Sequence, residues 1–292
     1  GEVVGSASLF LRDITVHGRP FKAGIAGDFA VDKEHRAFGP AIALQKSIIA
    51  NLGADNVDFA YTIPNEKSGP LLQRLGYREI GVYRRFVKIL KSEYRKGKNI
   101  FPVPMKGMAS RITDFTLKAL SKERRYRRPF SIRVETPAAF DKRFDHLSAD
   151  ANKRLSVAGT RTADFLNWRY MESPYRDYAI FAVSRENGVL AGYIVYYIHE
   201  NVAYIADMLF DDTRESIKTL LSEFCNRMRD EGVGSISIRY VGGESLESSI
   251  KEMNFIEDKR TQAKVLVYPG AEPNQFLLNK ENWYLLEGDN DV

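Results

Sequence analysis

The 292-residue chain contains a single cysteine, Cys225, only four histidines, and no long hydrophobic run. One cysteine excludes an internal disulfide framework and fits a reducing compartment. The histidines are scattered, and no Cys/His cluster has metal-ligand spacing, so no metal is expected. No segment approaches the ~20 apolar residues of a membrane-spanning helix, and no secretory signal is recognised. We therefore expect a cytoplasmic protein without an integral membrane segment.

The chain carries a small net positive charge. Lys and Arg number 43 against 38 Asp and Glu, which gives a net charge of +5. This excess is small for a nucleic-acid-binding protein, and a ligand that carries phosphates would account for it equally well, so no nucleic-acid partner is expected. The content of 44% hydrophobic and 28% charged residues is that of a globular protein long enough for two domains.

Residues 27–41 predict a strand, a short turn and the start of a helix. The strand alternates up to Asp32, and the helix is indicated by apolar residues at helical spacing, namely Ile42, Leu44, Ile48, Ile49 and Leu52. Unpaired N–H groups at a helix start suit a phosphate, Arg36 adds positive charge, and Gly39 has no Cβ to block close approach. Taken alone, the same residues also fit an ordinary helix start.

Two motifs together carry a family resemblance. Residues 36–41, Arg-Ala-Phe-Gly-Pro-Ala, resemble the coenzyme A pyrophosphate loop of the GNAT acyltransferase superfamily, Arg/Gln-x-x-Gly-x-Gly/Ala. Residues 65–77, Asn-Glu-Lys-Ser-Gly-Pro-Leu-Leu-Gln-Arg-Leu-Gly-Tyr, are similar to the superfamily's Asn-x-x-Ala-x-x-Leu-Tyr-x-x-Leu-Gly-Phe without a gap. A strand-like run at 57–62 joins them. The resemblance covers roughly residues 1–90.

The resemblance implies acetyl-CoA or another acyl-CoA as co-substrate. It implies that Val31 offers backbone groups to the pantetheine arm and that Asn65 and Ser68 flank this arm. It further implies a set of residues around the pyrophosphate: Arg36, Ala37, Phe38, Gly39, Pro40 and Ala41.

The order of predicted elements occurs twice. Strands are expected at 3–10, 21–31, 57–62 and 82–89, with helices at 41–52 and 69–75. From residue 130 the pattern restarts, with strands at 131–135, 179–184, 192–199, 202–210, 235–241 and 263–268 and helices at 213–231 and 244–253. Residues 27–32 (Gly-Asp-Phe-Ala-Val-Asp) also match 206–211 (Ala-Asp-Met-Leu-Phe-Asp). The chain therefore reads as a tandem duplication.

The expected fold class is α/β (α+β), with two GNAT-like domains that each hold a mixed, mostly antiparallel sheet flanked by helices. Residues 1–95 form the acyl-CoA-binding domain, in which the N-terminal strand and helices of the family are lacking. A basic linker follows at 96–129, and its segment 105–128 offers peripheral contact with an anionic membrane surface. Residues 130–292 form a degenerate second domain, structural or acceptor-binding, in which Asp211 and Asp212 replace the phosphate loop.

The expected catalytic groups depart from the pattern of the family. Many family members use a Tyr as general acid where this chain has Leu72, and the matching position of the second half is Ile250. Asp28 is the best remaining general base, because an aspartate in an apolar strand has its pKa raised by desolvation. A structural role for Asp28 is the alternative. His35 and Tyr61 are weaker candidates, expected to face solvent and to be buried with a bonded hydroxyl, respectively. Cys225 is expected in the core.

The sequence thus predicts an acyl-CoA-dependent N-acyltransferase, with acetyl as the expected acyl group, acting on an amine acceptor. Aromatic residues of the second half favour a small-molecule or glycan acceptor such as an amino sugar or a surface-polysaccharide precursor. They are Trp168, Tyr170, Tyr175, Tyr178, Tyr193, Tyr196 and Tyr197. The tail at 283–291 either closes over a cleft or is only an ordered terminus. The alternatives are a non-catalytic acyl-CoA-binding or scaffold protein and a Fem-type aminoacyl transferase. The oligomeric state is left open.

Overall fold

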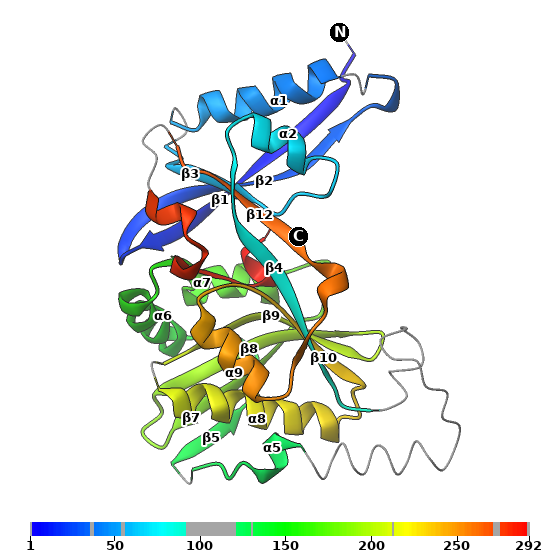
Figure 1. Cartoon of the computed structure of the whole chain (residues 1–292). Coiled ribbons are helices and arrows are strands. Elements are labelled where there is room, and N and C mark those ends of the chain that lie inside the picture. Colours follow the sequence, from blue (N-terminus) through cyan, green and yellow to red (C-terminus); the bar gives the residue numbers. More distant parts are fainter. Residues whose placement is uncertain are drawn as a thin grey trace, which may run out of the picture.

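The computed structural model describes residues 2–35, 38–53, 56–91, 121–129, 131–211, 213–270 and 275–290, which form a mixed α/β fold (Figure 1). The strands and helices expected from the sequence are confirmed in kind and order. Those of the first part are β1 (Gly5–Val16), β2 (Arg19–Val31), η1 (Lys33–His35), α1 (Phe38–Asn51), β3 (Phe59–Thr62), α2 (Gly69–Arg74) and β4 (Arg78–Ile89). The predicted linker lies outside the described residues up to residue 120, as does most of the segment expected to contact a membrane surface.

The second part contains more elements than the sequence predicted. The helices are α5 (Lys122–Arg125), α6 (Lys142–Arg154), α7 (Ala163–Leu166), η2 (Asn167–Met171), α8 (Arg214–Asp230), α9 (Glu244–Glu252), η3 (Lys259–Thr261), η4 (Gln275–Leu278), η5 (Lys280–Asn282) and η6 (Glu287–Asp289). The strands are β5 (Ile132–Glu135), β6 (Val157–Gly159), β7 (Ala179–Arg185), β8 (Leu190–His199), β9 (Val202–Phe210), β10 (Ser235–Gly242), β11 (Ile256–Glu257), β12 (Ala263–Tyr268) and β13 (Trp283–Leu285). No helix within the described residues combines the length and hydrophobicity needed to span a bilayer.

The first hairpin is longer than predicted. β1 continues to Val16 and turns into β2 through His17 and Gly18, whose φ angles are 49° and 71°. Two positive φ angles define the tight turn that matches the twist of a hairpin, and glycine adopts such an angle without strain. The expected first strand, 3–10, therefore stopped six residues short of the true end of β1 at Val16.

Within the described residues the strands join into one sheet in the order β11-β4-β12-β3-β2-β1-β6-β13-β10-β9-β8-β7-β5, with a further pairing of β4 with β10. The pairs β2–β3, β9–β10 and β6–β13 are parallel and the others are antiparallel. Each parallel pair β2–β3 and β9–β10 is linked by a helix, α1 or α8, as parallel strands require.

Strands cross between the two predicted halves. β12, near the end of the chain, lies between β3 and β4 of the first half, where Val267 pairs with Tyr61 on one side and with Arg78 on the other. In return, the second part of β4 pairs with β10, from Arg84 opposite Tyr240 to Ile89 opposite Ser235. Figure 1 shows β4 running from the upper part of the molecule into the lower part. The division into two domains stays a prediction, but neither half completes its sheet alone.

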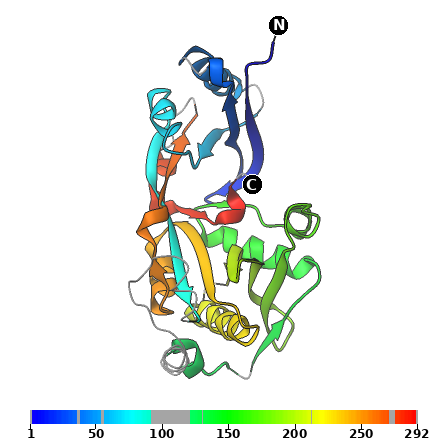
Figure 2. The same cartoon turned by 90° about the vertical axis from the view of Figure 1, so that its right-hand side faces the viewer.

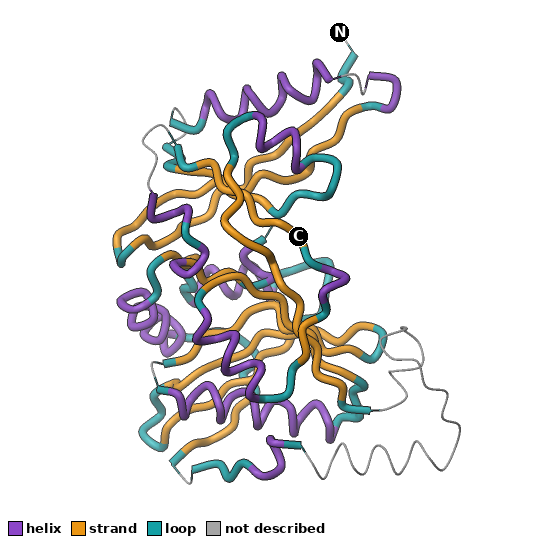
Figure 3. Tube along the Cα trace, in the orientation of Figure 1, coloured by secondary structure: helices purple, strands orange, loops and turns teal. Residues whose placement is uncertain are grey.

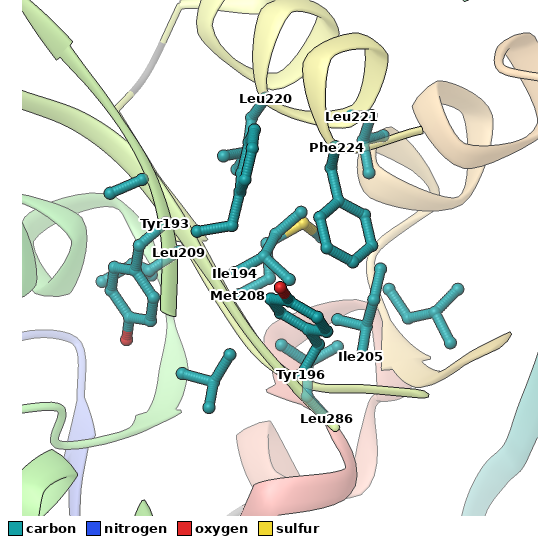
Figure 4. Packing of buried hydrophobic residues seen from close by; sticks show 14 of the residues in the cluster. Tyr193, Ile194, Tyr196, Ile205, Met208, Leu209, Leu220, Leu221, Phe224 and Leu286 are labelled. Atoms are coloured by element: carbon teal, nitrogen blue, oxygen red, sulfur yellow. The ribbon is translucent and has the colours of Figure 1, made fainter. Parts of the chain in front are cut away.

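The largest hydrophobic core lies in the second half. Residues of β8 and β9 such as Ile194 and Met208 pack against Leu220 and Phe224 of α8, all fully buried (Figure 4). Cys225 is buried in the same cluster, and burial raises the pKa of its thiol to about 12. The expected core position of this cysteine is confirmed, and an inert thiol results.

A second core joins the halves. It gathers Ile14 and Tyr61 from the first half with Val265, Trp283 and Leu285 from the last part of the chain. The C-terminal segment accordingly lies between the upper and lower parts of the molecule (Figure 2). Helices lie outside the strands, with α1 and α2 at one end and α8 and α9 at the other (Figure 3).

Candidate functional site

A narrow cleft opens where β2 and β3 part. The two strands pair in parallel as far as Ile25 opposite Tyr61, and the Thr62 hydroxyl still donates a hydrogen bond to the Ala26 carbonyl at 2.8 Å. Beyond that point the strands enclose a cleft of about 140 Å³. Its walls are residues 26–29 of β2, Thr62 at the end of β3 with residues 63–65 after it, Gln45 of α1, and Ser68 and Leu72 at α2.

Asn65 and Ser68, both predicted to flank a pantetheine arm, meet at this cleft. The Asn65 side-chain oxygen accepts hydrogen bonds from the backbone N–H groups of Lys67 (3.0 Å) and Ser68 (2.9 Å) and from the Ser68 hydroxyl (3.1 Å). Asn65 therefore fixes the turn that leads into α2. Ligand binding by these two residues stays a prediction.

The start of α1 offers room for a ligand. Gly39 lies in the first turn of this 14-residue helix, and a Cβ built on it would meet no described atom within 4 Å. The first N–H groups of a helix have no partner within the helix and carry partial positive charge, so this end fits a phosphate. Pro40 and Ala41 follow, half-buried. Arg36, Ala37 and the side chain of Phe38 lie outside the described residues.

Val31 lies apart from the cleft. It ends β2, pairs with Gly5 of β1, and does not contribute to the walls of the cleft. Its predicted contact with a pantetheine arm stays a prediction.

Asp28 is exposed, so the expectation of a desolvated carboxyl is wrong for this residue. The cause is a bulge in β2: Ser8 pairs with Gly27 and Ser6 with Ala30, which leaves Asp28 and Phe29 opposite one residue of β1. Asp28 adopts a φ of 46°, a left-handed conformation that aspartate tolerates better than most residues. Its carboxylate has no hydrogen bond or ion pair with any described residue.

A larger cavity of about 510 Å³ lies on the other side of Asp28, which lines both spaces. β1 and β2 form one wall of this cavity, and residues 165–175 with Gly288 and Asn290 form the others. The predicted role of the tail is therefore resolved in part: the tail lines a cavity. The geometry places one free carboxylate between a narrow cleft and a cavity of the size that holds small ligands.

Asp207, the counterpart of Asp28 in the repeated motif, has a different environment. It is buried and accepts two hydrogen bonds from the Arg161 Nε, at 3.0 and 3.1 Å, and one from the Tyr193 hydroxyl at 3.1 Å. Burial raises the pKa of Asp207 above its ordinary value despite the opposing charge of Arg161. A carboxylate bonded in this way is structural.

Arg161 belongs to a buried network that crosses the molecule. Its Nη2 contacts Asp289 Oδ2 at 2.5 Å, and Asp289 Oδ1 accepts from Arg12 Nη2 of β1 at 3.2 Å. Burial alone would raise the pKa of Asp289, but the charges of Arg161 and Arg12 lower it. With Asp207 the network holds two positive and two negative charges, so the charges compensate one another in the interior.

The corresponding place in the second half is a cavity of about 440 Å³, lined by Phe210 of β9, Ile217 of α8, Tyr240 of β10 and Leu246 of α9. β9 and β10 part after Ile205 and Ile238, and Tyr284 of β13 lines the cavity, with its hydroxyl donating to the Met208 carbonyl at 2.8 Å. At the start of α8, Asp211 accepts a hydrogen bond from the Thr213 N–H at 3.0 Å and pairs with Arg185, so a carboxylate lies at this end of the helix. Asp212 lies outside the described residues.

The weaker catalytic candidates are placed as expected. His35 is exposed, with its Nδ1 3.3 Å from Asp32. Tyr61 is buried, and its hydroxyl donates to the Asp289 carbonyl at 2.5 Å. Leu72 and Ile250 are buried aliphatic side chains that carry no proton to donate.

Sequence reasoning missed several residues at these spaces. Gln45 lines the narrow cleft, is 2% exposed, and its side-chain oxygen has no partner within the described chain. Arg12 and Glu172 line the larger cavity. Arg12 had a signal, since it shares the buried face of an alternating strand with Ile14 and Val16, where a charge requires a partner. Within the described residues no group of three or more His, Cys, Asp or Glu is placed to hold a metal ion.

Comparisons with known proteins support the fold. A family model described as an acetyltransferase (GNAT) domain matches residues 1–80. Among curated proteins, none matches the chain by sequence. Many solved structures share the fold.

One similar structure is a GCN5-related N-acetyltransferase from Anabaena variabilis, with 11% identity and a TM-score of 0.62 over 91% of this chain and 60% of that one. Another is a probable N-acyltransferase from Enterococcus faecalis, with 14% identity and a TM-score of 0.61 over 92% and 59% of the two chains. A third is the Saccharomyces cerevisiae N-myristoyltransferase with bound myristoyl-CoA, with 11% identity and a TM-score of 0.61 over 92% and 68%. The chain spans about three fifths of the length of the first two.

Proposed function

The GNAT acetyltransferase domain at residues 1–80 makes this chain a member of the GNAT superfamily, and from this premise we propose that it is an acyl-CoA-dependent N-acyltransferase. Acetyl is the expected acyl group and an amine the expected acceptor. The acyl-CoA would bind the first half, with its phosphates at the start of α1 and its arm in the narrow cleft.

One observation carries the proposal: Asp28 is an exposed, unpaired carboxylate that lines both the narrow cleft and the larger cavity. A thioester at the end of the cleft and an amine in the cavity would therefore meet beside it. A primary amine is protonated at neutral pH and attacks a carbonyl only after it loses a proton, so a base at this point is what the reaction requires.

The chain's own residues account for part of the reaction. Asp28 accepts the ammonium proton directly or through one water, which frees the nitrogen lone pair for attack on the acyl carbon. The C–N bond forms, the C–S bond breaks, and the sulfur leaves with its electron pair. The nitrogen, which is positively charged once the C–N bond has formed, releases its second proton to solvent and gives the neutral amide. Leu72 supplies no proton here, but a thiol pKa near ~8.5 lets the leaving group depart as a thiolate that solvent reprotonates.

We propose that the second half arose by duplication and no longer binds acyl-CoA. Hairpin, helix, parallel strand and helix follow one another in both halves, as β1-β2-α1-β3-α2 and β8-β9-α8-β10-α9. Asp211 places a carboxylate at the start of α8, which corresponds to the start of α1, and its charge would repel a phosphate. The second half would instead contribute cavity walls for the acceptor.

Calorimetric titration with acetyl-CoA tests the proposal. Gly39 and Gly53 lie at opposite ends of α1, and a side chain on either meets no described atom within 4 Å. Gly39→Glu places a negative charge against the phosphates, and we expect at least a ~10-fold loss of affinity, or about 1.4 kcal/mol. Gly53→Glu is the matched control and should bind acetyl-CoA like the unmodified protein.

The alternatives give different results. A Fem-type aminoacyl transferase would not bind acetyl-CoA at all. A non-catalytic acyl-CoA-binding or scaffold protein would bind it but release no thiol when amines are offered. Thiol release that depends on an amine therefore separates the enzyme from both.

A further inference from the structure

The wall of the cavity beside Asp28 holds two carboxylates that are unpaired within the described chain. Asp28 and Glu172 line it, and neither carboxylate has a hydrogen bond or ion pair with a described residue. The guanidinium of Arg12 is neutralised by Asp289 at 3.2 Å, and its Nη1 also donates to the Thr160 carbonyl at 2.8 Å. Arg169 donates to the Asn290 carbonyl at 3.0 Å and is the remaining cation of the wall. Two free carboxylates against one guanidinium favour a cationic ligand.

The same cavity gathers exposed hydrophobic side chains. Of the nine large hydrophobic residues that are exposed in the described chain, four line this cavity: Phe10 (41%), Leu11 (62%), Trp168 (62%) and Tyr175 (83%). Scattered apolar residues need no explanation, but a cluster around a cavity marks a ligand or partner site.

The aromatic side chains are held at fixed positions. Phe165 packs against Trp168 with 5.8 Å between ring centroids, and the Arg12 guanidinium lies 3.7 Å from the Phe165 ring centroid. Because Arg12 is bound to Asp289 as well, the buried network fixes one side of the aromatic wall. Trp168 therefore packs against a Phe165 ring that the buried network holds in place, and its own ring is exposed to solvent at the cavity.

We propose that this cavity binds the acceptor and that the acceptor is a small arylalkylamine, a primary amine joined by a short chain to an aromatic ring. This inference rests on the proposed function. The ammonium group lies between Asp28 and Glu172, and the ring packs against Trp168 and Tyr175. A sugar body would need hydrogen-bond partners around its whole ring, whereas Phe10, Leu11 and Ile25 offer none from one wall.

The chain carries an internal probe of this cavity. It has two tryptophans, and one of them, Trp283, is 2% exposed, whereas Trp168 is 62% exposed at the cavity. Titration of the full chain with 2-phenylethylamine should change the fluorescence of Trp168 saturably. Trp168→Phe should abolish this change. Glu172→Gln should weaken the amine at least ~10-fold, as loss of one charged partner predicts, while Glu200→Gln, exposed and outside the cavity, should not.

Steady-state thiol release then compares acceptors with acetyl-CoA as donor. We expect 2-phenylethylamine to be preferred over glucosamine. Trp168→Ala should raise the KM for 2-phenylethylamine about 10-fold, in line with loss of a stacking partner, with little change in kcat. Val189→Ala, exposed at 54% outside the cavity, is the matched control.

The outcomes separate the two proposals. If acetyl-CoA does not bind, or no amine releases thiol, the proposed function fails, and the fluorescence titration still decides whether the cavity binds the amine. If glucosamine is preferred, the proposed acyltransferase function stands and the arylalkylamine assignment is overturned. The same holds if Trp168→Ala raises only the KM for acyl-CoA donors with longer acyl chains. Absence of a saturable fluorescence change overturns it as well.

Discussion

Asp28 and Asp207 occupy the same position of a motif that occurs twice in the chain, yet one carboxylate is exposed and free and the other is buried on Arg161. The two occurrences of the motif therefore hold the same residue type in different environments. This difference separates a group available for chemistry from a group that holds the fold.

The two aspartates give a matched pair of substitutions. Asp28→Asn removes the proposed base from an exposed position. We expect amine-dependent thiol release to fall about 100-fold or more, which is the usual contribution of general base catalysis. The thermal unfolding midpoint should stay within roughly 1–2 °C, because exposed substitutions cost little.

Asp207→Asn is the counterpart and should have the opposite profile. It leaves Arg161 with one carboxylate less in the interior, so the unfolding midpoint should drop clearly while acyl-CoA affinity at the distant narrow cleft persists. Circular dichroism melting and calorimetric titration measure the two effects. An Asp28→Asn enzyme with full activity would exclude Asp28 as the base.

Asp289 is expected to be the most costly residue of the buried network to alter. Asp289→Asn leaves Arg12 and Arg161 with a single compensating carboxylate, Asp207. Breaking a buried ion pair costs about 3–5 kcal/mol, which lowers the unfolding midpoint by roughly 10 °C in a chain of this size. Asp150→Asn, whose ion pair with Lys153 is exposed, is the control and should change stability by less than ~0.5 kcal/mol.

The pH dependence follows from the lowered pKa of Asp289. A carboxyl with a lower pKa in the folded than in the unfolded protein stabilises the fold above its unfolded value, and the contribution is lost as the pH falls through the folded value. The stability difference between the unmodified chain and Asp289→Asn should therefore be constant above the ordinary value of 3.8 and shrink below it. Denaturant unfolding at several pH values measures this difference. A stability difference that persists in strong acid would show that Asp289 acts by packing rather than by charge.

Most of the secondary structure could be predicted from the sequence because it follows local rules. The alternating strand before Asp32, the apolar spacing of α1 and the turn at Asn65 each depend on neighbours within a few residues. The order of the strands and helices along the chain was predicted as well. The exposure of Asp28 could not be predicted, because a bulge depends on the register with β1 rather than on the strand's own sequence.

Long-range pairings were beyond sequence reasoning for the same reason. Val267 lies between Tyr61 and Arg78, which precede it by 206 and 189 positions in the chain, and nothing local in β12 indicates these partners. The larger cavity is missed likewise, since Asp28 and Glu172 become neighbours of one space only through the packing of the two halves. Of the aromatic residues of the second half from which an acceptor site was predicted, Trp168 and Tyr175 line this cavity.

Gln45 allows stability and binding to be separated. Its buried side-chain oxygen lacks a partner in the described chain, which costs about 1–3 kcal/mol for such a group. Gln45→Met keeps an unbranched side chain of similar size, so we expect the unfolding midpoint to rise by a few degrees, roughly as that cost predicts. If an amide N–H of the acyl-CoA arm donates to this oxygen, acetyl-CoA affinity should fall about 10-fold.

The control for this change is Gln73→Met on the exposed side of α2. It should alter neither the unfolding midpoint nor the affinity. A Gln45→Met protein that binds acetyl-CoA as tightly as the unmodified chain would mean that the arm does not reach the wall formed by α1.

The exchange of strands predicts that the first half cannot fold alone. A fragment of residues 1–91 lacks β12, so β3 and β4 lose the strand between them, and the fully buried Val265, Leu266 and Val267 are missing from the core. Unpaired strand edges of this kind favour aggregation. We expect the fragment to show no cooperative unfolding by circular dichroism. Joining residues 259–270 to it through a flexible Gly/Ser linker should restore a cooperative transition, while a linked segment with Val267→Asp should not, because it would bury an unpaired charge. Cooperative unfolding of the bare fragment would contradict the shared sheet.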